Sequence, residues 1–121
     1  MKGMSELEGT EGTVGIIVSN LNRARRWYEQ VLGRTPECEP VPGILEWKMG
    51  GAWLQLEEGN ADPAGCTFRI GVKNLKAERA RLLELNVRVT DATGIPGLIQ
   101  FFDFSDPDGN KLNLYELAHD A

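Results

Sequence analysis

Reactive side chains are scarce in this sequence. It holds one histidine, His119, close to the end of the chain, and two cysteines, Cys38 and Cys66, in unrelated surroundings. Neither cysteine lies near a histidine or at the start of an expected helix, so a thiolate nucleophile is not predicted. General acid–base chemistry would need groups whose pKa values are shifted by burial. The candidates for that role are Glu57, Asp103 and Tyr115.

Two helices are expected among the elements that position these groups. Apolar residues at helical spacing predict helices over Leu21–Leu32 and Leu75–Leu85. An asparagine suited to N-capping, Asn20 or Asn74, precedes each one. Gly33 and Asn86 follow them, where a left-handed residue ends many helices.

Short β-rich runs separated by turn residues predict the strands. We expect them at Thr13–Val18, weakly at Thr35–Glu39, and at Ile44–Met49, Ala52–Glu57, Thr67–Val72, Val87–Thr90, Leu98–Phe104 and Lys111–Glu116. Residues 1–12 are polar and are interpreted as a flexible tail. The polar, glycine-containing stretch 58–65 is interpreted as a linker.

The pattern repeats once along the chain. Matching residues lie 54 positions apart at the same element boundaries, as in Thr13 and Thr67, Val18 and Val72, and Asn20 and Asn74. Each unit has the order β-α-β-β-β, and one unit alone would leave a sheet face uncovered. The two units are therefore expected to pair with each other or across a dimer.

A turn near the end of the chain is the sharpest local signal. In Ser105-Asp106-Pro107-Asp108-Gly109-Asn110, proline and glycine stand where a type I turn needs them. Together with VSNLNRARRWYEQVLG near the start, FxFSDPDGNKLNLYE resembles the vicinal oxygen chelate superfamily. That group includes glyoxalase I, extradiol dioxygenases and bleomycin-resistance proteins, and the resemblance covers residues 13–117.

The resemblance implies an α+β fold in which two βαβββ modules form a curved eight-stranded mixed sheet, with the helices on its convex side. Residues 13–118 would form a single domain, with module 1 at about 13–57 and module 2 at about 66–117. Relatives of this length commonly complete their clefts with a second chain. A homodimer is therefore also implied.

Metal ligands of the superfamily lie at four positions on the concave face. In this chain those positions carry Thr13, Gln55, Thr67 and Asn113. None offers an imidazole, thiolate or carboxylate, the ligands that zinc, nickel or iron require. We therefore expect no metal and no other cofactor, and no glycine-rich phosphate loop follows a strand.

Strand alternation indicates which side chains share the cleft with those positions. Trp53 accompanies Gln55, Arg69 accompanies Thr67, and Tyr115 accompanies Asn113. Phe101 and Asp103 would face the cleft unless a bulge reverses them. The predicted ligand-binding set is Trp47, Trp53, Gln55, Arg69, Phe101, Asp103, Asn113 and Tyr115. Trp47 could point either way, and Arg69 could instead pair with Glu57 or Asp103.

Charge and composition exclude some partners. The net charge of −5 disfavours nucleic acid, and no apolar run approaches the length of a membrane helix. No signal peptide is recognised, and two cysteines fit a reducing compartment, so the cytoplasm is expected.

Three functions remain open. The first is a metal-independent protein that binds a small organic molecule in an aromatic cleft, and the negative charge favours cationic ligands. The second is a glyoxalase-like lyase or isomerase, against which the four ligand positions argue. The third is a non-catalytic, dimerising interaction domain whose aromatic face is an interface, since such residues are often core or interface.

Overall fold

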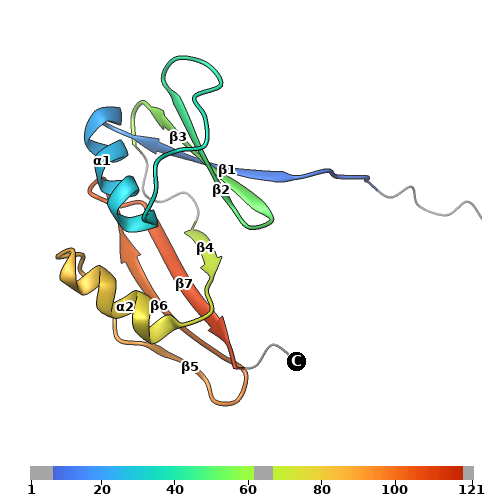
Figure 1. Ribbon diagram of the computed structural model, residues 1–121, viewed down its shortest axis with the longest axis vertical. Coiled ribbons are helices and arrows are strands. Elements are labelled where there is room, and N and C mark those ends of the chain that lie inside the picture. The colour runs from blue at the N-terminus through green and yellow to red at the C-terminus, as the bar shows by residue number, and fades with distance from the viewer. Residues whose placement is uncertain (1–6, 62–66, 119–121) are drawn as a thin grey trace, which may run out of the picture.

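The structure, a computed structural model, describes residues 7–61 and 67–118 and has an α+β fold (Figure 1). Its elements in chain order are β1 (Gly12–Val18), α1 (Leu21–Leu32), β2 (Ile44–Met49), β3 (Ala52–Glu58), β4 (Thr67–Gly71), α2 (Leu75–Glu84), β5 (Thr93–Ile95), β6 (Ile99–Ser105) and β7 (Lys111–Leu117). Both predicted helices, the first strand of each module and the last two strands of each module are confirmed. Cys66 and His119 lie outside the described residues.

The strands form two sheets. The first has the order β1-β3-β2 and the second β4-β7-β6-β5. In each module the first strand pairs in parallel with the last, and the last two strands form an antiparallel hairpin. The repeat is therefore visible in the strand order, but the expected single eight-stranded sheet is wrong for this chain. β1 and β4 are each an edge strand of their own sheet, so neither sheet continues into the other module.

Two predicted strands are reduced to isolated bridges. The segment 35–39 contributes one bridge, Cys38 to Glu46, and the segment 87–90 contributes one, Val89 to Phe104. Pro36 lacks a backbone N–H, which limits ladder formation in the first case. Conversely, β5 was not predicted. Its hairpin with β6 turns at Pro96-Gly97, where Gly97 has φ +76°, and this Pro-Gly pair was the available signal.

The local signals at the helix ends and the last turn are confirmed. Oδ1 of Asn20 accepts the backbone N–H of Arg23, and Oδ1 of Asn74 accepts that of Ala77. Gly33 and Asn86 both have positive φ, at +79° and +63°. In the Asp106–Gly109 turn, Gly109 donates its N–H to the Asp106 carbonyl over 2.9 Å.

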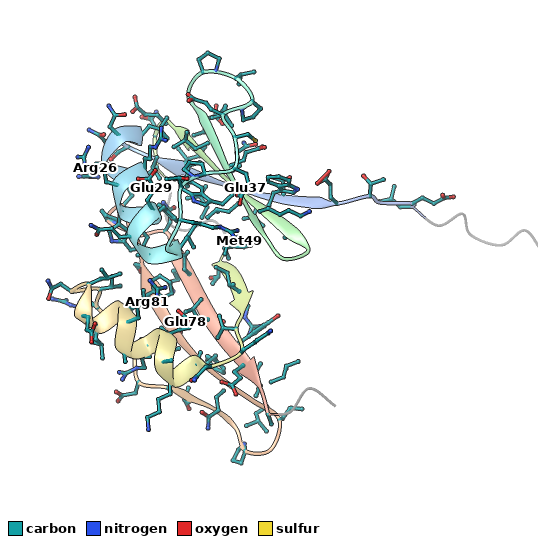
Figure 2. The ribbon with its side chains drawn as sticks, viewed as in Figure 1. Arg26, Glu29, Glu37, Met49, Glu78 and Arg81 are labelled. Atoms are coloured by element: carbon teal, nitrogen blue, oxygen red, sulfur yellow. The ribbon has the colours of Figure 1, made fainter. Side chains whose placement is uncertain are left out.

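Each helix covers one face of one sheet, and one continuous core joins the two modules (Figure 1). Alternate residues of the strands point into it, including Leu54 and Leu56 of β3. A second link lies between the helices: the Arg81 guanidinium, held by Glu78, donates to the carbonyls of Gln30 and Val31 at the end of α1 (Figure 2). A cation there is stabilised by the helix dipole.

Candidate functional site

The face of the second sheet that is turned away from α2 carries most of the predicted binding residues. Cross-strand register places Arg69, Asn113 and Asp103 in one row across β4, β7 and β6. The next row holds Gly71, Tyr115 and Phe101. Phe102 and Phe104 point to the core instead, so no bulge reverses the hairpin.

Hydrogen bonds connect the first of these rows. Nε of Arg69 donates to Oδ1 of Asn113 over 3.1 Å, and Nδ2 of Asn113 donates to Oδ1 of Asp103 over 2.7 Å. Asn113 is only 4 % exposed, whereas the two charged residues at the ends of the row are exposed. Within the described residues, Arg69 therefore forms no direct pair with Glu57 or Asp103, which was the alternative to a ligand-binding role. The amide stands between the opposite charges.

Tyr115 lies flat against the strand beside it. A Cβ atom built on Gly71 would come within 3.0 Å of the Tyr115 ring, so only glycine leaves room for the ring in this position. The Arg69 guanidinium carbon lies 4.9 Å from the ring centroid, within cation–π range. Arg69 is thus fixed by an amide on one side and an aromatic ring on another.

Two open hollows meet at Tyr115. One, of about 670 Å³, is lined by Gly71–Lys73 and 115–118. The other, of about 560 Å³, lies between the β2–β3 turn and β4 and is also lined by Arg34 and Arg69. Both volumes fall within the range of small-molecule sites.

The remaining predicted residues lie on the first sheet. Trp53 and Gln55 share its open face, and Trp53 pairs in register with Thr13 and Lys48. The Lys48 ammonium lies 5.9 Å from the Trp53 ring centroid, and the Trp53 indole N–H donates to Glu11. No hydrogen bond in the described part of the chain joins the side chains of this face to the Arg69 row.

Trp47 does not lie on either open face. Its side chain is fully buried under α1, and its indole N–H donates to the Arg34 carbonyl over 2.9 Å. Of the two orientations left open from the sequence, the structure shows the inward one. Trp47 is therefore a core residue in this chain.

Comparison with known proteins was informative only at the level of structure. No protein-family model and no curated protein sequence matches the chain. A glyoxalase/bleomycin resistance protein from Catenulispora acidiphila matches with a TM-score of 0.76 and 21 % identity, covering 89 % of this chain and 98 % of that one. TnmS3, an antibiotic binding protein from Streptomyces sp. CB03234, matches at 0.72 and 23 %, covering 93 % and 99 %. A glyoxalase/bleomycin resistance protein/dioxygenase from Nocardioides matches at 0.74 and 14 %, covering 97 % and 89 %.

The chain has the glyoxalase/bleomycin resistance fold. The resemblance inferred from the sequence is thereby confirmed for the fold, and two helices with two mixed sheets are compatible with it. None of the helices in the described ranges is long and apolar enough to cross a membrane.

The metal-ligand positions of this fold can now be tested on geometry. Thr13 and Gln55 lie on the open face of one sheet, and Thr67 and Asn113 on that of the other. Both polar atoms of the Asn113 amide are already bonded, and a guanidinium lies beside it, which disfavours a second cation. Within residues 7–61 and 67–118, no three His, Cys, Asp or Glu side chains come together. These residues do not fit a catalytic metal.

Sequence reasoning missed several residues of the open faces. Ile44, Glu46 and Lys48 of β2 flank Gln55 and Trp53 on the first sheet. Alternation groups these three residues on one face of β2, but the sequence did not show which face is open, because Trp47 could point either way. Lys111 stands next to the Arg69 row on the second sheet and was not among the predicted binding residues.

Proposed function

We propose that this chain is a metal-independent protein that binds a small organic molecule against its open sheet faces, with residues 13–118 acting as one binding domain. The observation that carries the proposal is the row of Arg69, Asn113 and Asp103 beside Tyr115 and its two hollows. A fixed aromatic ring with a few oriented polar groups is typical of small-molecule sites.

One of the structural neighbours supports a binding function by its name, and others have the names of enzyme families. One neighbour of the same fold is an antibiotic binding protein, whereas others carry glyoxalase and dioxygenase names. Fold alone does not decide between these activities. The amide and hydroxyl groups at the four ligand positions support the binding function, because they disfavour the metal that a glyoxalase-like lyase or isomerase would need.

Calorimetric titration with a panel of planar aromatic compounds tests the proposal. We expect saturable binding at one site, weakened by Tyr115→Leu and unchanged by Val41→Ala, an exposed residue in the loop before β2. Added nickel, zinc, iron or manganese should change neither the affinity nor the tryptophan emission. Retention of one metal per chain, or a panel without any binder, would refute the proposal.

We also propose that the protein acts as a homodimer. β1 is an edge strand of seven residues with an exposed first half, and such edges are normally covered. Val18 accepts a bond from Gly59, so by strand alternation the backbone N–H of Thr13 points away from β3. Thr13→Pro should then weaken a dimer, whereas Thr13→Val should not, as measured by light scattering with size-exclusion chromatography. A monomer at high concentration in the unmodified protein would contradict the proposal.

One observation favours a different function, an interaction domain without a ligand. Ile95, Leu98 and Leu117 are each more than half exposed at one end of the second sheet. If a dimer covers this end together with Tyr115, the aromatic face is an interface. A Tyr115→Leu variant that loses the dimer without any compound being bound would support this alternative.

We further propose a cytoplasmic location, which fits the free, exposed thiol of Cys38.

A further inference from the structure

The charge of Arg69 is not balanced by a direct partner. Five arginines form ion pairs with carboxylates: Arg23, Arg25, Arg34, Arg79 and Arg81. Arg69 forms none within the part of the chain that the structure describes. Among the same residues, the Arg69 side chain donates from Nε to Asn113 and from neither terminal nitrogen, so both terminal nitrogens can donate to a ligand.

The amide of Asn113 keeps Arg69 apart from the acid on the same face. Its oxygen accepts from Arg69 and its nitrogen donates to Asp103, so its orientation is fixed by both neighbours. The two charged residues stand on strands separated by β7, roughly 10 Å apart at two strand spacings. An amide group lies between the two charged groups and both of them are exposed to water, so Asp103 neutralises Arg69 only in part.

The guanidinium is also held in place before any ligand arrives. Tyr115 lies flat because Gly71 has no side chain, and the Arg69 guanidinium lies over the same ring. Lys111 adds a second exposed positive charge in the neighbouring row. A preorganised, planar donor fork is the usual partner of a carboxylate or another anionic oxygen.

We propose that the open face of the second sheet selects planar aromatic ligands that carry an anionic oxygen, a carboxylate or a phenolate, bound by the terminal nitrogens of Arg69. The inference rests on the proposed binding function and names its ligand class. It reverses the expectation drawn from the net charge of −5, which favoured cations, because the charge nearest the aromatic ring is positive.

The test compares three probes with one ring system: 2-naphthoate, neutral 2-naphthamide and cationic 2-naphthylmethylammonium, each titrated calorimetrically into the full chain. We expect 2-naphthoate to bind roughly 10-fold or more tightly than the other two, the range for hydrogen bonds to a charged group. Arg69→Gln should remove that preference, so that 2-naphthoate binds no more tightly than 2-naphthamide does to the same variant. Arg26→Gln, which removes the same charge from the outward side of α1, should leave all three affinities unchanged (Figure 2).

The outcomes separate the inference from the function on which it rests. Equal binding of all three probes, or tighter binding of the cation, would overturn the anion preference and leave small-molecule binding intact. An anion preference that survives in Arg69→Gln would also overturn it, since the preference would then come from other charges. If no probe binds to the unmodified protein, both the inference and the proposed function fall. Circular dichroism of each variant confirms that it is folded.

Discussion

The buried hydroxyl of Tyr28 donates a 2.8 Å hydrogen bond to Oδ2 of Asp106, and this bond joins the helix of the first module to the last turn of the second. Asp106 also accepts from the backbone N–H groups of Asp108 and Asn110 and from the Asn110 side chain. Burial, together with the Asp106 charge, raises the pKa of Tyr28 well above its usual range, so the phenol remains a donor.

Removal of the Tyr28 hydroxyl should therefore cost stability. We expect Tyr28→Phe to lower the free energy of unfolding by roughly 1.5–3 kcal/mol, since the acceptor is a buried carboxylate. Urea denaturation measures the change. Tyr115→Phe is the matched control, because the Tyr115 hydroxyl makes no hydrogen bond in the described part of the chain, and it should cost little. Equal effects of the two variants would show that the Tyr28–Asp106 bond does not hold the modules together.

Asp108 should make stability depend on acid pH. Partial desolvation acts to raise its pKa, but hydrogen bonds from the Ser19 hydroxyl and N–H and the charge of Arg23 outweigh it, so the pKa lies below its usual range. A carboxylate with a lowered folded-state pKa stabilises the protein above its unfolded pKa, near 3.9, and that contribution is lost as pH falls through the folded value. The difference in melting temperature between the unmodified protein and Asp108→Asn should be full at pH 7 and shrink below about pH 4. A difference that is constant from pH 7 to pH 3 would exclude this role.

The contact between Gly71 and Tyr115 predicts a local effect on binding. In Gly71→Ala the new Cβ meets the ring at 3.0 Å and must displace it, together with the guanidinium that lies over it. The backbone of Gly71 does not have positive φ, so the fold should tolerate alanine. We expect the affinity for 2-naphthoate to fall several-fold while the melting temperature changes little. Gly9→Ala, which lies before β1 and where the added Cβ meets nothing within 4 Å, is the control and should bind normally.

Replacement of Arg81 should lower the unfolding free energy more than replacement of an ordinary surface arginine. Its guanidinium donates to two carbonyls at the end of α1, whereas Arg25 only pairs with Glu29 on the same helix. Arg81→Met should lower the unfolding free energy by about 1–3 kcal/mol, and Arg25→Met by less than about 0.5 kcal/mol. Chemical denaturation of both variants decides the matter. If Arg81→Met is as mild as its control, the helices are held together by the core alone.

Signals confined to a few neighbouring residues predicted structure well. Asn20 and Asn74 cap their helices, Gly33 and Asn86 end them, and the proline–glycine turn after Ser105 forms as expected, because each depends on local backbone geometry. The alternation of β3 likewise separated Leu54 and Leu56 from the open face, since a strand has only two faces.

Features that depend on distant partners could not be predicted. Strand alternation allowed Trp47 to face either the core or the open side of β2. Only its contact with Arg34 and α1 in the structure shows that it faces the core. The choice of Asn113 rather than Asp103 as the partner of Arg69 depends on the register of three strands. The single eight-stranded sheet was implied by the family resemblance, and the sequence does not specify whether the edge strands β1 and β4 meet.

The first sheet carries a row of residues that corresponds to the Arg69 row of the second sheet. Gly15, Gln55 and Glu46 stand in a row across β1, β3 and β2, and they match Arg69, Asn113 and Asp103 position by position. Both copies keep a central amide and an acid on one flank, but only the second has a cation on the other. A Cβ on Gly15 would approach only the Gln55 amide, at 3.9 Å, so the missing side chain leaves unfilled space. The matching rows of the two halves therefore differ by one positive charge, and a molecule lying between such halves would have one preferred direction.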